Sequence, residues 1–336
     1  MMGDRTFSPV CSLRTGRLLA ALAASSLLSV AGCGSPTATP LLPAPAVPTA
    51  TPLEGEILPA PSPTSEESPA PAPSPTAVSG WKPIFPANDG PSPRFDHVTI
   101  HDPSDDRLVV FGGRGERIFA DTWVYDIALE RWSEVPGAGP PDRFGMAAAY
   151  EAARNRILLF GGQGSGDLFY NDVWAFNLET LTWAKMVTAG GPPSARYGTS
   201  AIVDDSRDRL IISHGFTFSG RFDDTWALNL DTFEWEEITP DGTKPLKRCL
   251  HEAVYDAAGD RMLLFGGCSS GFGPCPQGDL WSFHLANHAW TEITPVEGPS
   301  PVSNPSLVFD PERLAAILFG GNSSEGPSAQ LWRFAG

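Results

Sequence analysis

Short apolar runs recur along the chain from residue 81 to residue 336, and each run leads into a pair of small residues. The first clear run is Val109–Phe111, followed by Gly112–Gly113, and the same order returns about every fifty residues. Apolar stretches of four to six residues that alternate with turn clusters, such as residues 102–105, are typical of β-strands. We therefore predict four short strands in every repeat.

Tryptophan, acidic and arginine residues recur in register with these small pairs. An acid lies ten residues before each pair, and an arginine lies eight residues before the acid. The fifth copy has Val302 at the arginine position, and the third has His214 at the first glycine position. The arginines are Arg94, Arg143, Arg196 and Arg248; the tryptophans that follow, nine residues apart, are Trp123/Trp132, Trp174/Trp183, Trp226/Trp235 and Trp281/Trp290.

One four-stranded repeat cannot bury both faces of its own sheet. Repeats of this kind stack, and radial stacking of four-stranded units of about fifty residues gives a β-propeller. On the glycine pair, the spaced aromatic residues and the tryptophan of the fourth strand, the copies resemble kelch repeats from Trp81 to Gly336. We therefore predict an all-β fold, a β-propeller of five four-stranded kelch-type blades.

The two ends of the repeat region indicate how the ring closes. The last copy stops after its third strand, at residues 331–336, whereas a fourth-strand pattern opens the region at Trp81–Ile84. Trp81 precedes Arg94 by thirteen residues, a spacing that recurs between the second and third copies. We predict that the Trp81 segment completes the last blade, so that five blades close within one chain.

The residues before the repeats predict an exported, lipid-anchored protein. Residues 1–32 combine early arginines with an apolar run too short to span a bilayer, as in a signal peptide. Val30–Cys33 resembles the lipobox of bacterial lipoproteins and implies a diacylglycerol on Cys33; an ordinary signal peptide with a chance cysteine is the alternative. Residues 33–80 are rich in Pro, Ala, Thr and Ser, which predicts a disordered linker before the propeller at 81–336. We expect the protein in the cell envelope, anchored outside the cytoplasmic membrane.

Charge narrows the range of partners. The chain has 23 Lys and Arg residues against 39 Asp and Glu residues, a net charge of −16. Nucleic-acid binding needs clustered positive charge, and so does attachment to anionic lipid through a basic patch. We therefore expect no nucleic acid, contact with the bilayer through Cys33 alone, and an envelope protein or a glycan as the partner.

Binding residues are expected on one face of the ring. In an antiparallel blade the start of the first strand lies beside the end of the second, so the arginine loops and the loops after the glycine pairs emerge together. These loops carry aromatic and arginine side chains that suit a protein or a sugar. The candidate residues are Arg94, Arg143, Arg196, Arg248, His97, His251, His214, Arg117, Phe169, Tyr170, Phe216, Phe218 and Arg221.

The recurring arginines have two interpretations. The four that begin the copies could form an incomplete ring around an anion, or each could tie one blade to its neighbour through backbone carbonyls, which their recurrence favours. A second set is predicted to be solvated in turns at the opposite face: Arg107, Arg156, Arg209 and Arg261. His97 and His251 share one repeat position, but the other copies place no ligand there, so we expect neither a metal nor another cofactor.

An enzyme is the alternative class of function. Kelch propellers similar to galactose oxidase or to sialic-acid mutarotases would imply a carbohydrate-active enzyme. The tyrosines show no copper-ligand arrangement, and no acid–base pair stands out, so we assign no catalytic residue. A binding module is therefore the first interpretation.

Three cysteines fall in the fourth copy: Cys249, Cys268 and Cys275. In an exported protein we expect two of them to form a disulfide and one to remain a thiol. Cys268 with Cys275 would close a short loop, and Cys249 with Cys268 would staple two strand ends. The sequence leaves both pairings open.

Overall fold

The computed structural model describes residues 83–240, 242–269 and 275–336. The chain divides into two units, residues 1–77 and 78–336, and the fold described below belongs to the second. The predicted leader (1–32), Cys33, the linker (33–80) and Trp81 lie outside the described residues. Within those described ranges, no helix is long and apolar enough to cross a membrane.

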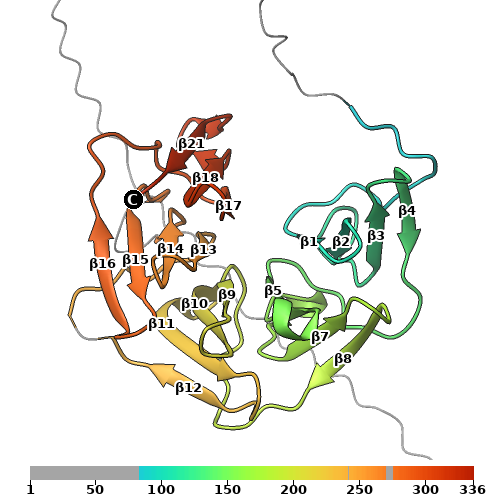
Figure 1. The fold of residues 1–336 in the computed structure, drawn as a ribbon, viewed down its shortest axis with the longest axis horizontal. Helices are drawn as coiled ribbons and strands as arrows, with labels where there is room; N and C mark the ends of the chain where they lie inside the picture. Colours follow the sequence, from blue (N-terminus) through green and yellow to red (C-terminus); the bar gives the residue numbers. More distant parts are fainter. Residues whose placement is uncertain (1–82, 241, 270–274) are drawn as a thin grey trace, which may run out of the picture. The chain divides into compact units, whose positions relative to one another are not determined.

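Five antiparallel sheets form the blades of a propeller (Figure 1). The prediction of an all-β propeller with five kelch-type blades is confirmed. Blade 1 comprises β1 (Val98–Asp102), β2 (Arg107–Phe111), β3 (Thr122–Asp126) and β4 (Arg131–Glu134), and blade 2 comprises β5 (Ala147–Glu151), β6 (Arg156–Phe160), β7 (Val173–Asn177) and β8 (Thr182–Met186). Blade 3 comprises β9 (Ser200–Asp204), β10 (Arg209–Thr217), β11 (Gly220–Asn229) and β12 (Trp235–Ile238), and blade 4 comprises β13 (Glu252–Asp256), β14 (Arg261–Phe265), β15 (Leu280–His284) and β16 (Ala289–Ile293). Blade 5 comprises β17 (Ser306–Asp310), β18 (Ala315–Phe319) and β21 (Leu331–Phe334).

Short elements complete the described part of the chain. A small hairpin of β19 (Asn322–Ser323) and β20 (Gly326–Pro327) follows β18. Two 3-10 turns, η1 (Ala152–Arg154) and η2 (Ser165–Asp167), lie in the loops of blade 2. These elements sit at the ends of the blades, where loops connect the strands.

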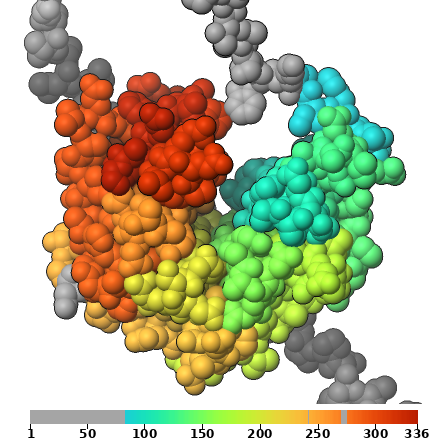
Figure 2. Space-filling view, viewed as in Figure 1, coloured from blue at the N-terminus to red at the C-terminus, as the bar shows by residue number. Residues whose placement is uncertain are grey.

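The core lies between the blades, as the two-faced repeat requires. Leu158 and Phe160 of β6 form one buried cluster with Leu210 and Trp235 of blade 3, and a similar cluster joins blades 3 and 4. Burial of these faces away from water stabilises the stack of blades. The inner strands β1, β5, β9, β13 and β17 follow one another. They line a central channel with a volume of 820 Å³, and Figure 2 shows the hollow that it forms.

Backbone geometry explains the glycine pairs at the ends of the second strands. Gly161 and Gly162 have φ angles of +71° and +99°, in the left-handed region that side chains disfavour. A Cβ atom on Gly161 would lie 2.7 Å from the carbonyl oxygen of Arg196 in the next blade. The glycine therefore lets two blades approach closely, and His214 takes up a φ of +59° at the equivalent position of blade 3.

The fifth blade differs from the predicted four strands. Its sheet has three strands in the described part of the chain, ordered β17-β18-β21. Trp81 and Lys82 are not described, and Ile84 belongs to no strand and is 60% exposed. Pro83 has no backbone N–H to donate to a neighbouring strand, which weakens pairing at that position. Closure by the Trp81 segment therefore stays a prediction, which the described residues 83 and 84 do not support.

Ala87, which follows this segment, nevertheless makes the contact with the next blade that the repeat predicts. The Ala87 amide donates to the carbonyl of Glu130, two residues before Trp132 of β4, at 2.8 Å. Between blades 2 and 3, the Ala189 amide donates to the carbonyl of Phe233, two residues before Trp235, at 2.9 Å. Ala87 therefore contacts blade 1 in the same way as Ala189, between blades 2 and 3, contacts blade 3.

Candidate functional site

The arginines that begin the first four copies are buried, and each forms a strut, a hydrogen-bonded bridge inside its own blade. Arg143 is fully buried, and its Nη1 and Nη2 donate to the two carboxylate oxygens of Asp172 at 2.7 and 3.2 Å. Nη1 also donates to the carbonyl of Gly161 at 3.0 Å, and the Trp174 indole donates to Asp172 at 2.8 Å. Burial acts to raise the pKa of Asp172, but hydrogen bonds from Arg143 and the charge of Arg143 lower it below its usual value. The guanidinium is therefore fully engaged by its own blade.

The same strut recurs in blades 1, 3 and 4. In each, a bidentate arginine–aspartate pair is completed by the tryptophan two residues after the aspartate, and burial opposed by the arginine leaves the aspartate pKa lowered. Aromatic rings lie over three of the four guanidinium groups at 4.0 Å, and Tyr170 over Arg143 is one of them. The struts are Arg94/Asp121/Trp123, Arg143/Asp172/Trp174, Arg196/Asp224/Trp226 and Arg248/Asp279/Trp281.

The second set of arginines is not solvated, which corrects the prediction for the opposite face. Arg107, Arg156, Arg209 and Arg261 expose only 13–15% of their side chains. Each pairs with the recurring acid five residues before it, the residue that precedes the second strand's turn. Three of them also donate to a carbonyl of the next blade, at Leu178, Leu285 and Gly336. Arg107, Arg209 and Arg261 therefore tie their blades to the next one.

Two further arginines bridge consecutive blades at the same end. Arg154 of blade 2 donates to the two carboxylate oxygens of Asp208 in blade 3 at 2.7 and 2.8 Å. Arg207 of blade 3 donates to those of Asp260 in blade 4 at 2.7 Å each. At this end of the propeller, ion pairs therefore join blade 2 to blade 3 and blade 3 to blade 4.

At the other end, the loops meet as predicted. The residue after each recurring arginine pairs with the residue after each glycine pair, at Phe95/Arg114, Phe144/Gln163, Tyr197/Phe216, Cys249/Cys268 and Ser303/Asn322. Backbone hydrogen bonds then run from blade to blade around the channel mouth: Gly145 to Asp96, Gly198 to Gly145, Leu250 to Gly198, and Asn304 to Leu250. We call these five residues, Asp96, Gly145, Gly198, Leu250 and Asn304, the mouth ring.

Aromatic and arginine side chains gather on this face, over blades 1 to 3. Phe169 packs edge-on to Phe218 with ring centroids 4.9 Å apart, and Tyr197 packs edge-on to Phe216 at 5.5 Å. Arg114 lies over the rings of Phe95 and Phe144 at 4.7 and 4.3 Å, and Arg221 lies over Phe216 at 5.2 Å. We call this set the aromatic–arginine patch: Phe95, Arg114, Phe144, Phe169, Tyr197, Phe216, Phe218 and Arg221.

The patch includes four predicted residues and four that the sequence did not single out for binding. Phe218 and Phe95 are its most exposed rings, at 65% and 55%. Arg117, also predicted for this face, is exposed and lies over the Phe119 ring at 5.1 Å. The arginines of the struts lie below the patch rather than in it.

The predicted histidines lie deeper. His214 and His251 are buried with ring centroids 5.4 Å apart, and burial holds the pKa of each well below its usual value. His251 Nε2 and the Ser200 hydroxyl of blade 3 are 2.8 Å apart, whereas His97 lines the channel. Across the described residues, no group of His, Cys, Asp and Glu side chains is arranged to hold a metal ion.

Glu252 is a channel residue that sequence reasoning missed. It begins β13 and lines the channel, and its side chain has no hydrogen bond or ion pair within the described part of the chain. Burial raises the pKa of this carboxyl from 4.5 to about 8. The sequence signal that could have identified it is a glutamate at the repeat position that Ser200 occupies in blade 3.

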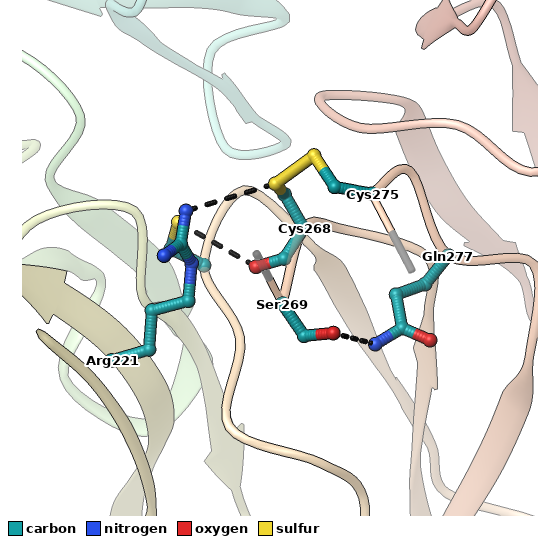
Figure 3. The surroundings of a disulfide bond; sticks show 6 residues. Arg221, Cys268, Ser269, Cys275 and Gln277 are labelled. Carbon is teal, nitrogen blue, oxygen red and sulfur yellow. Dashed lines mark hydrogen bonds between the residues drawn. A yellow bond between two sulfur atoms is a disulfide. The ribbon is translucent and has the colours of Figure 1, made fainter. Parts of the chain in front are cut away.

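The structure shows which of the two predicted cysteine pairings is formed. Cys268 and Cys275 form a disulfide, and Cys249 is a buried free thiol. Arg221 Nη2 lies 3.7 Å from Cys268 Sγ, beside the bond (Figure 3). The free thiol, the disulfide and the guanidinium thus share one end of blade 4.

Comparison with known proteins agrees with this architecture. The sequence profile of the KLHDC2/KLHL20/DRC7 Kelch-repeats domain matches residues 76–267. The chain is 31% identical over 130 residues to Kelch domain-containing protein 2 of Bos taurus, covering 37% of this chain and 30% of that protein. It is 28% identical over 256 residues to the dynein alpha chain, flagellar outer arm, of Chlamydomonas reinhardtii, covering 72% and 6%. It is 33% identical over 108 residues to host cell factor homolog hcf-1 of Caenorhabditis elegans, covering 30% and 13%. The chain spans less than a third of each of these relatives.

Proposed function

The chain belongs to the kelch-repeat family, and from this premise we propose that its propeller is a binding module that holds a partner protein on the aromatic–arginine patch. The observation that carries the proposal is the exposure of Phe95 and Phe218 in a cluster with Arg114 and Arg221. Aromatic and arginine side chains supply most of the energy at protein interfaces, because they bury a large area at a small entropic cost. The rigid blades below fix their positions before a partner arrives.

The struts support this choice of face. Arg143, Arg196 and Arg248 are fully buried and neutralised by aspartates, so they hold the loops in place and leave recognition to the residues above. Preorganised loops lose little conformational entropy on binding. The patch therefore combines exposed anchors with a fixed backbone.

A double substitution of the two most exposed rings tests the patch. The wild-type chain is used as bait in pull-downs from the native envelope, and the affinity of the double variant, Phe95→Ala with Phe218→Ala, for the recovered partner is then measured. We expect at least a tenfold weaker affinity, or about 1.4 kcal/mol. Val187→Ala and Val296→Ala are the matched controls, because those side chains are 89% and 103% exposed and lie outside the patch. Unchanged affinity in the double variant would refute the proposed face.

The same experiment identifies the class of partner. A protein partner is lost when the envelope extract is treated with protease, whereas a glycan partner survives protease and is lost after glycosidase treatment. We propose a protein; recovery of a protease-resistant, glycosidase-sensitive ligand would replace it with a glycan.

We further propose that the propeller is tethered to the cell envelope through a lipid on Cys33. The sequence supports this with the apolar run of residues 18–31, the Val30–Cys33 motif, and a proline-rich segment that separates the cysteine from the first blade. At about 3.1 Å per residue, an extended linker of this length would carry the binding face roughly 140 Å from the membrane.

Metabolic labelling tests the tether. Cells fed an alkyne-tagged fatty acid should label the wild-type chain, and Cys33→Ala should abolish the label and release the protein from the membrane fraction. Cys249→Ala is the matched control, because its thiol is buried in the propeller. A label that persists in the Cys33 variant would disprove lipidation at this residue.

A further inference from the structure

Three cysteines converge at the loop end of blade 4. Cys249 and Cys268 lie directly opposite each other in an antiparallel bridge, and their backbones exchange two hydrogen bonds of 3.1 and 2.8 Å. Cys268 is already bonded to Cys275, seven residues later. The central cysteine of the three is therefore shared between a disulfide and a facing thiol.

The facing thiol lies within reach of the disulfide. Side chains of directly opposite residues in an antiparallel pair point to the same side, with Cβ atoms about 4.5–5.5 Å apart. A disulfide joins Cβ atoms about 3.5–4.5 Å apart, so a small local movement brings the two sulfurs into bonding distance. The Cys249 thiol also donates toward the Cys268 carbonyl, with Sγ and O 3.9 Å apart.

One guanidinium group contacts both sulfurs. Arg221 Nη2 lies 3.7 Å from Cys268 Sγ, and Arg221 also hydrogen-bonds to the Cys249 thiol. The pKa of that thiol is raised overall, because burial outweighs the charge and the hydrogen bond of Arg221, which act in the opposite direction. Because the thiolate is the nucleophile in exchange with a disulfide, a cation at this position favours the reacting form.

We propose that Cys249 exchanges with the Cys268–Cys275 disulfide and thereby converts Cys275 into an accessible thiol. The Cys249 thiol gives its proton to solvent, and its sulfur attacks Cys268 Sγ. The Cys249–Cys268 bond forms as the Cys268–Cys275 bond breaks, and the electron pair leaves on Cys275 Sγ, which takes up a proton. The step is an isomerisation and needs no oxidant or reductant.

The exchange changes what the surroundings can reach. Cys249 is 2% exposed, whereas Cys275 is exposed at the surface of blade 4. One isomer therefore hides the free thiol, and the other presents it for a mixed disulfide with another protein. Arg221 also lies over Phe216, so the exchange site adjoins the aromatic–arginine patch.

Labelling of the folded, oxidised full chain tests the exchange. The chain is incubated with a maleimide at pH 8 without denaturant, and peptide mapping then scores each cysteine separately, so that Cys11 and Cys33 do not enter the result. We expect label to accumulate at Cys275 in the wild type and to fall at least tenfold in Cys249→Ser. Label on Cys249 alone, or equal label on Cys275 in both chains, would overturn the proposal.

Two further variants test the geometry without relying on the wild-type equilibrium. In Cys275→Ser, mild oxidation should join Cys249 to Cys268 and remove both free thiols. In the matched control Cys268→Ser, Cys249 and Cys275 should remain thiols under the same treatment, because they do not face each other. Thermal melting confirms that each variant is folded, and a folded Cys275→Ser chain that keeps both thiols after oxidation would exclude the exchange.

Discussion

The second and fifth blades carry the same repeat but hold themselves together in different ways. In blade 2, Arg143 is fully buried against Asp172, which also accepts a hydrogen bond from the Trp174 indole. In blade 5, Val302 fills the arginine position, and Gln330 fills the aspartate position. Both members of the ion pair have changed together, because a buried charge without its partner is costly.

Blade 5 replaces the strut with weaker contacts. The Gln330 side chain exchanges hydrogen bonds of 3.0 and 3.1 Å with the backbone of Ser300, and the Trp332 indole donates to it at 3.1 Å. Trp332 is 37% exposed and Leu331 69%. The arginine, aspartate and tryptophan are therefore one structural unit, and the blade without that unit is the more loosely packed one.

The neighbours of the two blades differ as well. Backbone hydrogen bonds of the mouth ring join Gly145 of blade 2 to blades on both sides, whereas Asn304 of blade 5 is joined to blade 4 only, as far as the described residues show. An inner blade is thus held from two sides. Within the described residues, no backbone hydrogen bond of the mouth ring joins blade 5 to blade 1.

The largest expected effect comes from breaking a strut. Arg196→Met should lower the free energy of unfolding by about 3–5 kcal/mol, because it leaves Asp224 partly buried without its cation. Arg196→Met with Asp224→Asn should recover part of the loss, and Val302→Ala, at the same position of blade 5, should cost only about 1–2 kcal/mol. Urea unfolding of the three chains measures the differences. A loss in Arg196→Met no larger than that in Val302→Ala would show that the strut is not what separates the blades.

The next effect concerns the open side of blade 5. If the Trp81 segment completes that blade, Trp81→Ala should destabilise the chain by about 3 kcal/mol, close to the effect of Trp290→Ala in blade 4. Its thermal melting temperature should fall accordingly, whereas removal of residues 34–79 should leave the melting temperature unchanged. A Trp81→Ala chain as stable as the wild type would mean that blade 5 keeps a free edge, as residues 83 and 84 suggest.

A smaller effect, on the pH dependence of stability, separates two neighbouring residues of blade 4, one paired with blade 3 and one lining the channel. Toward blade 3, His251 pairs with Ser200; Glu252, beside it on β13, has no partner in the described residues, and its pKa is raised to about 8. A carboxyl with a raised pKa keeps its proton in the folded chain while the unfolded chain loses it, so stability falls as pH rises from 4.5 to about 8. Glu252→Gln should raise the melting temperature on the order of 5 °C at pH 9 and little at pH 4.

Ser200→Ala is the matched control for this pH effect. It removes the bond to His251, whose lowered pKa keeps the imidazole neutral above pH 7, so its cost should be the same at pH 7 and pH 9. Equal gains for Glu252→Gln at pH 4 and pH 9 would show that the carboxyl does not titrate in this range.

The repeat made the architecture predictable, but the partners of individual side chains could not be predicted from the repeat in the same way. The spaced glycines and tryptophans indicated five blades and the meeting of the loops. The aspartates two residues before each first tryptophan, such as Asp172, recur as regularly as the arginines, and that spacing could have identified the strut. Arg107 was predicted to be solvated because a turn arginine gives no sign that a second blade will cover it.

Single residues outside the pattern were the hardest to place. Glu252 has no counterpart in the other copies, so its burial depends on packing that spacing does not encode. The choice of Cys275 over Cys249 as the partner of Cys268 likewise rests on side-chain positions within one loop. Phe95 and Phe144 follow the recurring arginines, yet only the folded loops show that they join the patch: Arg114 lies over both rings, and Phe144 also packs against Tyr197 of the next blade.

The arginine hydrogen bonds that cross between blades at the base of the propeller run forward along the chain, and this direction affects how the protein is made. Arg154 finds Asp208, and Arg207 finds Asp260, each in the blade that follows. A ribosome releases the chain from its N-terminus, so blades 2 and 3 emerge with one apolar face uncovered and with Arg154 and Arg207 paired only to an acid of their own blade, until roughly fifty more residues appear. We therefore expect blades to be added one at a time during synthesis, with the newest blade exposing an apolar face until its successor packs against it.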